Sequence, residues 1–246
     1  MYELIKNTAK RIIPKSFLKR NEGFFRSLVA LKYRGDKFEC NVCGFHLNQF
    51  VQLSNINEKL CPNCGSLPRT RRLTKILFSE INVENKNILH FSPPNALKKK
   101  IKKINPEGYV TTDYMDEFEA DKKLDITNIG EPNHSYDLII CYHVLEHIEE
   151  DRKAMAELFR ILKPNGLVLI QTPFKSGQIY ENKDIKTPED RLKHFGQDDH
   201  VRIYSVEGLV ERLEQNGFHL GVRQFEEEEV YFGLKKGEVI LFANKR

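Results

Sequence analysis

The sequence has no apolar run long enough to cross a bilayer, which takes about 20 consecutive apolar residues. Its first residues also lack the apolar core of a secretory signal peptide. Cysteine is scarce, with 5 residues in 246, and four of these fall into two closely spaced pairs. Such usage is typical of thiols in a reducing compartment. We therefore expect a cytoplasmic protein rather than a secreted or membrane-spanning one.

Neither sign of charge dominates the chain, whose formal net charge is +4. The charges are unevenly spread, however. Residues 1–75 hold 15 Lys or Arg against 5 Asp or Glu, whereas residues 76–246 hold 24 against 30. A basic front could meet phosphates, an anionic membrane surface or the chain's own acidic body. These partner classes stay open, as does the oligomeric state.

Residues 1–35 have the pattern of basic helices, divided by Pro14. The spacing of apolar residues favours a helical arm that packs on the rest of the chain. The alternatives are a peripheral anchor on anionic lipid and a nucleic-acid contact. Farther along, Arg69, Arg71 and Arg72 could bind a phosphate or pair with acidic residues.

Two Cys-x2-Cys pairs stand 17 residues apart, and a glycine follows each pair, where a tight turn needs a permissive backbone. Four thiolates at this spacing are typical of a closed, structural zinc site. We predict a zinc-ribbon-like module over residues 36–75, with Zn²⁺ held by Cys40, Cys43, Cys61 and Cys64.

From residue 87 onward, strand-like apolar runs alternate with amphipathic helical patterns. Strands are expected at 88–91, 109–113, 136–141, 167–172, 220–225 and 239–243, and helices at 96–104, 150–163 and 206–216. This alternation predicts an α/β fold with a doubly wound, mostly parallel sheet that ends in a hairpin. A polar insertion occupies residues 175–205.

Polar residues follow the apolar strand at 136–141. His143, Glu146 and His147 come directly after it, at the edge where open α/β sheets bind ligands. The spacing His-x-x-Glu-His also occurs, in another context, in an inverted zinc-protease motif, but the parallel sheet argues against that assignment.

Three segments together resemble the class I S-adenosylmethionine-dependent methyltransferases: YDLII at 136–140, VLEHI at 144–148 and LKPNG at 162–166. The zinc module with residues 65–69, and the segment 195–204, resemble a bacterial subgroup often found alongside polysaccharide biosynthesis. The resemblance implies a seven-stranded sheet with helices on both faces over residues 76–246, and S-adenosylmethionine as the cofactor.

The resemblance also implies a cofactor site. The family's glycine-rich loop corresponds here to a loop after the first strand that contains no glycine. Asp113 matches the acid that binds both ribose hydroxyls, and Asp125 with Ile126 matches the position beside adenine. The expected cofactor contacts are His90, Phe91, Ser92, Pro93, Asp113, Tyr114, Asp125, Ile126, Cys141, Tyr142 and His143.

Methyl transfer to a hydroxyl benefits from a general base. The candidates are His143 at the strand end and His200 in the insertion, with His194 as a further choice. A separate hypothesis is a divalent metal held by His143, Glu146, His147 and His200.

The leading functional hypothesis is methyl transfer to a small-molecule or glycan acceptor, at a hydroxyl oxygen. Two alternatives remain. One is an RNA methyltransferase that uses its basic, zinc-containing front, although this front lacks the interleaved aromatic residues of a single-strand binding surface. The other is a non-catalytic, methyltransferase-like binding module, because the cofactor loop has no glycine.

Overall fold

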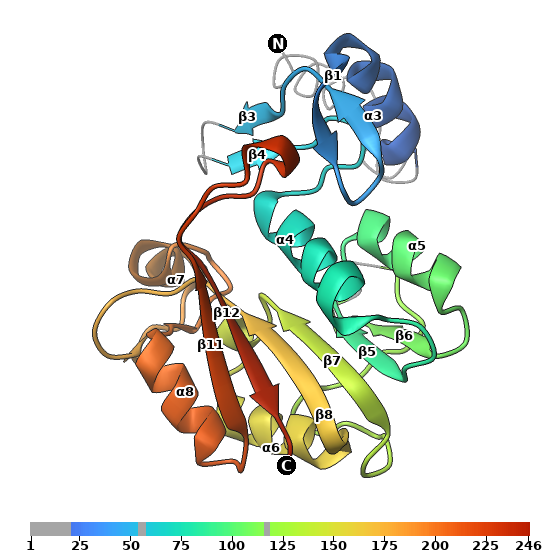
Figure 1. Cartoon of the computed structure of the whole chain (residues 1–246). Helices are drawn as coiled ribbons and strands as arrows, with labels where there is room; N and C mark the ends of the chain where they lie inside the picture. Colours follow the sequence, from blue (N-terminus) through green and yellow to red (C-terminus); the bar gives the residue numbers. More distant parts are fainter. Residues whose placement is uncertain (1–20, 54–57, 116–118) are drawn as a thin grey trace. The chain divides into compact units, whose positions relative to one another are not determined.

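The computed structural model describes residues 21–53, 58–115 and 119–246, which divide into two compact units (Figure 1). The smaller contains the described part of Met1–Asn82 together with Pro94–Lys100 and Phe225–Glu238. The larger contains Val83–Pro93, Ile101–Gln224 and Val239–Arg246. Each unit is therefore assembled from three ranges that are not contiguous in the sequence. The sequence-based boundaries at 35 and 75, in contrast, divide the chain into contiguous domains. The expected break at Pro14 lies outside the described residues.

The larger unit is built on one six-stranded sheet with the strand order β11-β12-β8-β7-β5-β6. The four neighbouring strands β8, β7, β5 and β6 are parallel to one another. Strand β12 runs antiparallel to β8, and Figure 1 shows β11 and β12 as a hairpin. The strands are β5 (Ile88–Phe91), β6 (Tyr109–Thr112), β7 (Tyr136–Tyr142), β8 (Leu162–Gln171), β11 (His219–Phe225) and β12 (Glu238–Asn244). The mostly parallel α/β sheet is confirmed.

The expectation of seven strands is wrong for the described residues. Beside β6, at the edge of the sheet, Thr112 and Lys122 form only an isolated parallel bridge. Two aspartate side chains around it bond to backbone instead: Asp121 accepts from the Thr111 amide at 2.9 Å, and Asp125 from the Thr127 amide at 2.8 Å. The Asp121 side chain takes the Thr111 amide of β6, and the Asp125 bond closes a local turn. The pairing beside β6 is therefore limited to a single bridge.

The core of the larger unit forms where helices α6 (Asp151–Ile161) and α8 (Val206–Glu214) meet the sheet. Met155 and Leu158 of α6 are fully buried against Ile139 of β7, as their spacing of three residues on one helix face predicts. The strand after α6 begins earlier than expected, at Leu162 rather than 167, because α6 already ends at Ile161.

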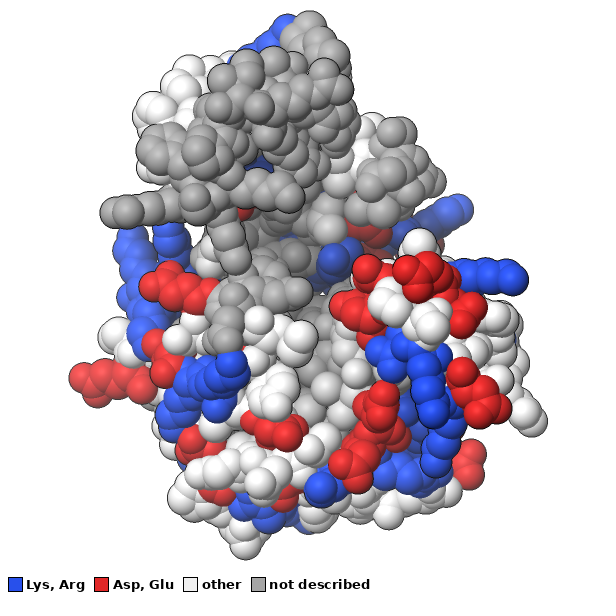
Figure 2. All heavy atoms as spheres, turned by 180° about the vertical axis from the view of Figure 1, so that it is seen from behind, with Lys and Arg blue, Asp and Glu red and all other residues white. Residues whose placement is uncertain are grey.

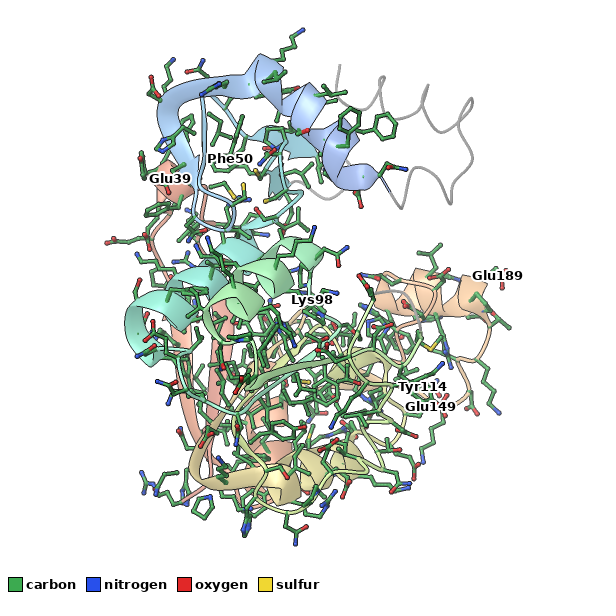
Figure 3. The ribbon with its side chains drawn as sticks, turned by 90° about the vertical axis from the view of Figure 1, so that its right-hand side faces the viewer. Glu39, Phe50, Lys98, Tyr114, Glu149 and Glu189 are labelled. Atoms are coloured by element: carbon green, nitrogen blue, oxygen red, sulfur yellow. The ribbon has the colours of Figure 1, made fainter. Side chains whose placement is uncertain are left out.

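The polar insertion has some regular structure. It contains β9 (Tyr180–Glu181), α7 (Pro188–Phe195) and β10 (Arg202–Ile203), and β9 pairs antiparallel with β10. Thr187 caps α7, accepting from the Asp190 amide at 3.1 Å. Figure 3 shows Glu189 on α7 pointing away from the sheet.

Figure 2 shows acidic and basic side chains interspersed over one face.

The smaller unit holds several short elements. These are α3 (Glu22–Ala30), β1 (Arg34–Cys40), β2 (Phe45–Leu47), β3 (Val51–Leu53), β4 (Glu58–Leu60), α4 (Pro68–Ile76), η2 (Leu77–Ile81) and η4 (Val230–Phe232), while α5 (Asn95–Ile104) is divided between the two units. No helix among the described residues is both long and apolar enough to span a bilayer.

Two buried arginines hold the smaller unit together. Arg71 is 0% exposed, and its guanidinium donates to the backbone carbonyls of Lys59, Phe232 and Gly233 at 2.8 Å each. Arg72 forms ion pairs with Glu238 at 3.0 Å and Glu229 at 3.2 Å. Both side chains are therefore paired within their own unit, and the phosphate role considered for them is not supported.

Burial of His90 in β5 predicts a pH effect on stability. Its side chain is 1% exposed, its Nδ1 lies 2.9 Å from the Tyr109 hydroxyl, and desolvation lowers its pKa to about 3. An unfolded histidine titrates near about 6.5. Below that pH the unfolded state binds more protons, so the free energy of unfolding should fall by up to about 1.4 kcal/mol per pH unit.

Denaturation of the unmodified protein and of His90→Gln between about pH 7 and pH 5 measures this contribution. Glutamine can still bond to the Tyr109 hydroxyl but does not titrate, so the variant should lose less stability as the pH falls. Equal slopes for the two proteins would contradict the prediction.

Candidate functional site

The carboxyl ends of β5, β6 and β7 meet at one edge of the sheet. His90 of β5 pairs in register with Thr111 of β6 and with Ile140 of β7. Because all three strands are parallel, the residues that follow them emerge side by side. This edge therefore brings together the expected cofactor residues after β5, β6 and β7.

Ser92 and Asp113 form the centre of this edge. The Ser92 hydroxyl donates to Oδ1 of Asp113 at 2.7 Å, and the Ser92 amide donates to the Thr112 carbonyl at 2.8 Å. Asp113 is 5% exposed, and Ser92 has a φ of 45°. That left-handed conformation is one that glycine usually supplies. A serine thus makes the turn here and also holds the carboxylate.

The other expected cofactor residues differ in accessibility. The side chains of Cys141 and Ile126 are buried, like that of His90. Burial raises the pKa of the Cys141 thiol. Tyr114, labelled in Figure 3, is 55% exposed. Asp125 is exposed, and hydrogen bonds from the Thr127 amide and hydroxyl lower the pKa of its carboxyl. Tyr114 and Asp125 can reach a ligand with their side chains, whereas His90 and Cys141, each 1% exposed, can offer it only backbone groups.

The turn after β7 gathers four of the polar residues singled out from the sequence. His143 has a φ of 54°, and its Nδ1 lies 3.0 Å from Oε1 of Glu146. The rings of His147 and His200 meet nearly at right angles, with their centroids 4.6 Å apart. Burial alone would raise the pKa of the Glu146 carboxyl. The contact with His143 has the opposite and larger effect, so the net shift of this pKa is downward. The carboxylate is therefore charged.

Arg202 fixes the insertion against this turn. Its guanidinium donates to the carbonyls of Leu145, Ile148 and Glu149, the last at 2.9 Å. One residue earlier, the Val201 amide donates to the Glu146 carbonyl at 2.9 Å. These bonds place His200, the residue before Val201, beside Glu146, although 54 positions separate the two in the sequence.

Several charged partners of Arg202 could not be identified from the sequence. Glu181 accepts from Nε of Arg202 at 2.9 Å and from Arg212 at 2.5 Å, and these two arginines lower the pKa of its carboxyl to about 2 against the opposing effect of burial. Asp151 accepts from the Tyr204 hydroxyl at 2.6 Å. The only signal available in the sequence was the density of polar residues around His200.

A large hollow lies between the start of α6 and the insertion. Its volume is about 1140 Å³, and charged side chains of both signs line it, among them Lys153, Lys186, Arg191, Glu149 and Glu181. A cavity of this kind suits a polar ligand rather than an apolar one.

The four predicted zinc ligands do converge. All four sulfurs lie within 4.8 Å of one another, with Cys40 to Cys64 at 3.6 Å and Cys43 to Cys61 at 3.9 Å. Sulfurs around a tetrahedral zinc ion are about 3.8 Å apart, given Zn–S bonds of about 2.3 Å. Gly44 and Gly65 follow the pairs with φ angles of 69° and 77°. The residues present fit a structural zinc ion.

Comparison with known proteins identifies a methyltransferase domain in this chain. A family model described as a methyltransferase domain matches residues 69–220. A curated relative from Mycolicibacterium smegmatis, named as an S-adenosylmethionine-dependent methyltransferase, is 32% identical over 89 residues. The match covers 36% of this chain and 31% of the relative, so the chain spans about a third of that protein's length.

Solved structures share the fold. An S-adenosylmethionine-dependent methyltransferase from Mesorhizobium loti superposes with a TM-score of 0.50 at 14% identity, covering 73% of this chain and 96% of the other. The cyclase SpnF gives 0.53 at 13% identity, covering 80% and 88%. The second title names a different reaction, so the fold alone does not settle the chemistry.

The cysteine geometry predicts one structural zinc ion per chain. Replacement of the fully buried Cys61 by serine should lower the zinc content by one ion per chain, measured by elemental analysis. Structural zinc contributes on the order of 10 kcal/mol to folding, so the smaller unit should also become sensitive to proteolysis.

Cys141→Ala is the matched control, because the fifth cysteine lies in the larger unit, outside the cluster. Zinc content should stay unchanged in that variant. Full zinc content in Cys61→Ser would argue against a four-thiolate site.

Proposed function

Since the chain belongs to the methyltransferase-domain family, we propose that it transfers a methyl group from S-adenosylmethionine to a hydroxyl oxygen of a small molecule or glycan. The observation that carries this proposal is the buried Asp113 carboxylate at the end of β6, held by the hydroxyl of Ser92. When bound, the cofactor supplies a methyl group on a positively charged sulfur, which is already activated for transfer.

Ser92 and Asp113 would hold the cofactor. A carboxylate at this strand end can accept hydrogen bonds from two vicinal hydroxyls, such as those of a ribose. Ser92 restrains that carboxylate before any ligand arrives, which reduces the entropy lost on binding.

His143 is the residue we assign as general base. Its Nδ1 faces Glu146, and its Nε2 is buried with no hydrogen-bond partner among the described residues. A carboxylate at one ring nitrogen fixes the tautomer and leaves the other nitrogen free to take a proton. His200, the other candidate, lies instead with Glu146 and His147, its ring against that of His147.

The mixed-charge hollow supports a hydrophilic acceptor. Its lining holds cations such as Lys153 and Arg191 beside carboxylates such as Glu149 and Glu181 within one space. Polyhydroxylated molecules such as sugars need both kinds of group, because each hydroxyl donates and accepts.

The two rival functions gain less support. An RNA methyltransferase would need free cations on the front, yet Arg71 and Arg72 are buried and paired within their own unit. A non-catalytic module was considered because the cofactor loop lacks glycine, but Ser92 adopts the conformation that glycine would supply.

Titration with S-adenosylhomocysteine tests the cofactor site. The unmodified protein should bind it, and Asp113→Asn should weaken binding by about 10-fold or more, since a hydrogen bond to a charged group contributes about 1.5–3 kcal/mol. Calorimetry gives both dissociation constants. The control is Glu107→Gln, an exposed acid near the amino end of β6. No binding by a folded protein would refute the proposal.

Labelled methyl transfer tests the acceptor class. The protein is incubated with methyl-labelled S-adenosylmethionine and a bacterial extract, with Asp113→Asn as the control for background transfer. Label should enter a ribonuclease-resistant low-mass or polysaccharide fraction and survive mild alkali, because methyl ethers resist base whereas methyl esters do not. Label released by ribonuclease would favour the RNA alternative instead.

A further inference from the structure

The turn after β7 carries polar atoms that the proposed methyl transfer leaves without a role. We propose that Glu146, His147 and His200 bind a divalent transition-metal ion, at a site separate from the four cysteines. The site rests on the geometry of these three residues, and only the use made of the ion rests on the proposed function.

The three side chains converge on one point. Their ligating atoms all lie within 4.8 Å of one another, which among the described residues is true of only one other group of His, Cys, Asp and Glu, the cysteine cluster. Donors around a tetrahedral ion with bonds of about 2.0–2.2 Å stand about 3.4 Å apart. The cluster therefore needs to contract by at most about 1.4 Å to hold an ion.

Two of the three residues are buried with polar atoms unsatisfied. Glu146 is 1% exposed, and its Oε2 has no hydrogen-bond partner among the described residues. His200 is 3% exposed, and its Nε2 is likewise without a partner in the described part of the chain. Leaving such groups unpaired costs about 1–3 kcal/mol each, and more for a charge. A shared cation would satisfy both.

The outer contacts of the two histidines are those of metal ligands. Nδ1 of His147 lies 3.1 Å from Oδ2 of Asp199, and the ring of His200 bonds to the backbone carbonyl of Phe195. Each partner can accept a hydrogen bond from one ring nitrogen, so the lone pair of the other ring nitrogen remains for a ligand. Ligating histidines almost always have such a partner, which fixes the tautomer and orients the ring.

The alternative is a purely structural ion pair between Glu146 and His143, whose atoms lie 3.0 Å apart. That ion pair leaves Oε2 of Glu146 and Nε2 of His200 unexplained. The nearby positive charge of Arg202 does not exclude a cation, because Glu181 accepts from its guanidinium at 2.9 Å. The metal site accounts for all of these contacts.

Two imidazoles and one carboxylate leave positions open on the ion. A Lewis acid there would lower the pKa of an acceptor hydroxyl beside His143, and so would assist the proton transfer assigned to that residue. The cysteine site differs in kind, because its four thiolates leave no open position.

Direct titration with Co²⁺ tests the site in the full-length, zinc-loaded protein. Calorimetry should report one Co²⁺ ion per chain, without the strong absorbance of thiolate-bound cobalt. Glu146→Gln and His200→Ala should each weaken binding by at least about 100-fold, because ligand loss exceeds the 10–100-fold cost of losing an outer contact. His147→Ala is the third variant. Because the His147 side chain is partly exposed, this variant should fold even where replacement of the buried Glu146 or His200 prevents folding.

His194→Ala is the matched control, a histidine of the same insertion whose Nδ1 contacts the Tyr180 hydroxyl at 2.7 Å outside the cluster. Its affinity for Co²⁺ should match that of the unmodified protein. The proposal is overturned if Co²⁺ does not bind, if it binds only with thiolate absorbance, or if the folded ligand variants bind it as well as the control. Because the readout is metal binding, its failure is distinguishable from a failure to bind S-adenosylhomocysteine.

Discussion

The guanidinium of Arg202 lies against the turn after β7, and the arrangement of the site depends on this contact. The residue is 5% exposed, and its guanidinium donates to three backbone carbonyls of this turn, those of Leu145, Ile148 and Glu149. A planar, delocalised cation with five donors in a fixed fork can satisfy several carbonyls at once. Glu181 balances its charge. Arg202 therefore completes the hydrogen bonding of the turn and also anchors the insertion that carries His200.

The sheet imposes a second constraint, because its parallel strands place Ser92, Asp113 and His143 directly after strand ends. The chain must turn sharply after a strand end, and at two such turns it adopts a positive φ, which glycine usually supplies. The residues at these two turns are Ser92 and His143. Strain of this kind persists only when the surroundings stabilise it. Ser92 is held by its bonds to Thr112 and Asp113, and the His143 amide donates to Gln171 at 2.8 Å.

How far the sequence predicts this molecule depends on whether a feature is local. The strand at 88–91 and the zinc knuckles are encoded by residues close together in the chain, and both are found as expected. The seventh strand is not, since it depended on whether the backbone would continue along β6 beyond the bridge at Lys122 or turn locally at Asp125. The Arg71 contacts reach across more than 160 residues, a distance that no local pattern encodes.

The cluster at Glu146 combines both kinds of information. The spacing of Glu146 and His147 is local, but the third member, His200, comes from the insertion and needs Arg202 to bring it there. A buried carboxylate and a buried imidazole with unpaired atoms would destabilise the fold if their burial served only packing. The chain nevertheless uses several hydrogen bonds to hold them together. This arrangement is more readily explained by a ligand that the cluster binds than by the stability of the turn itself.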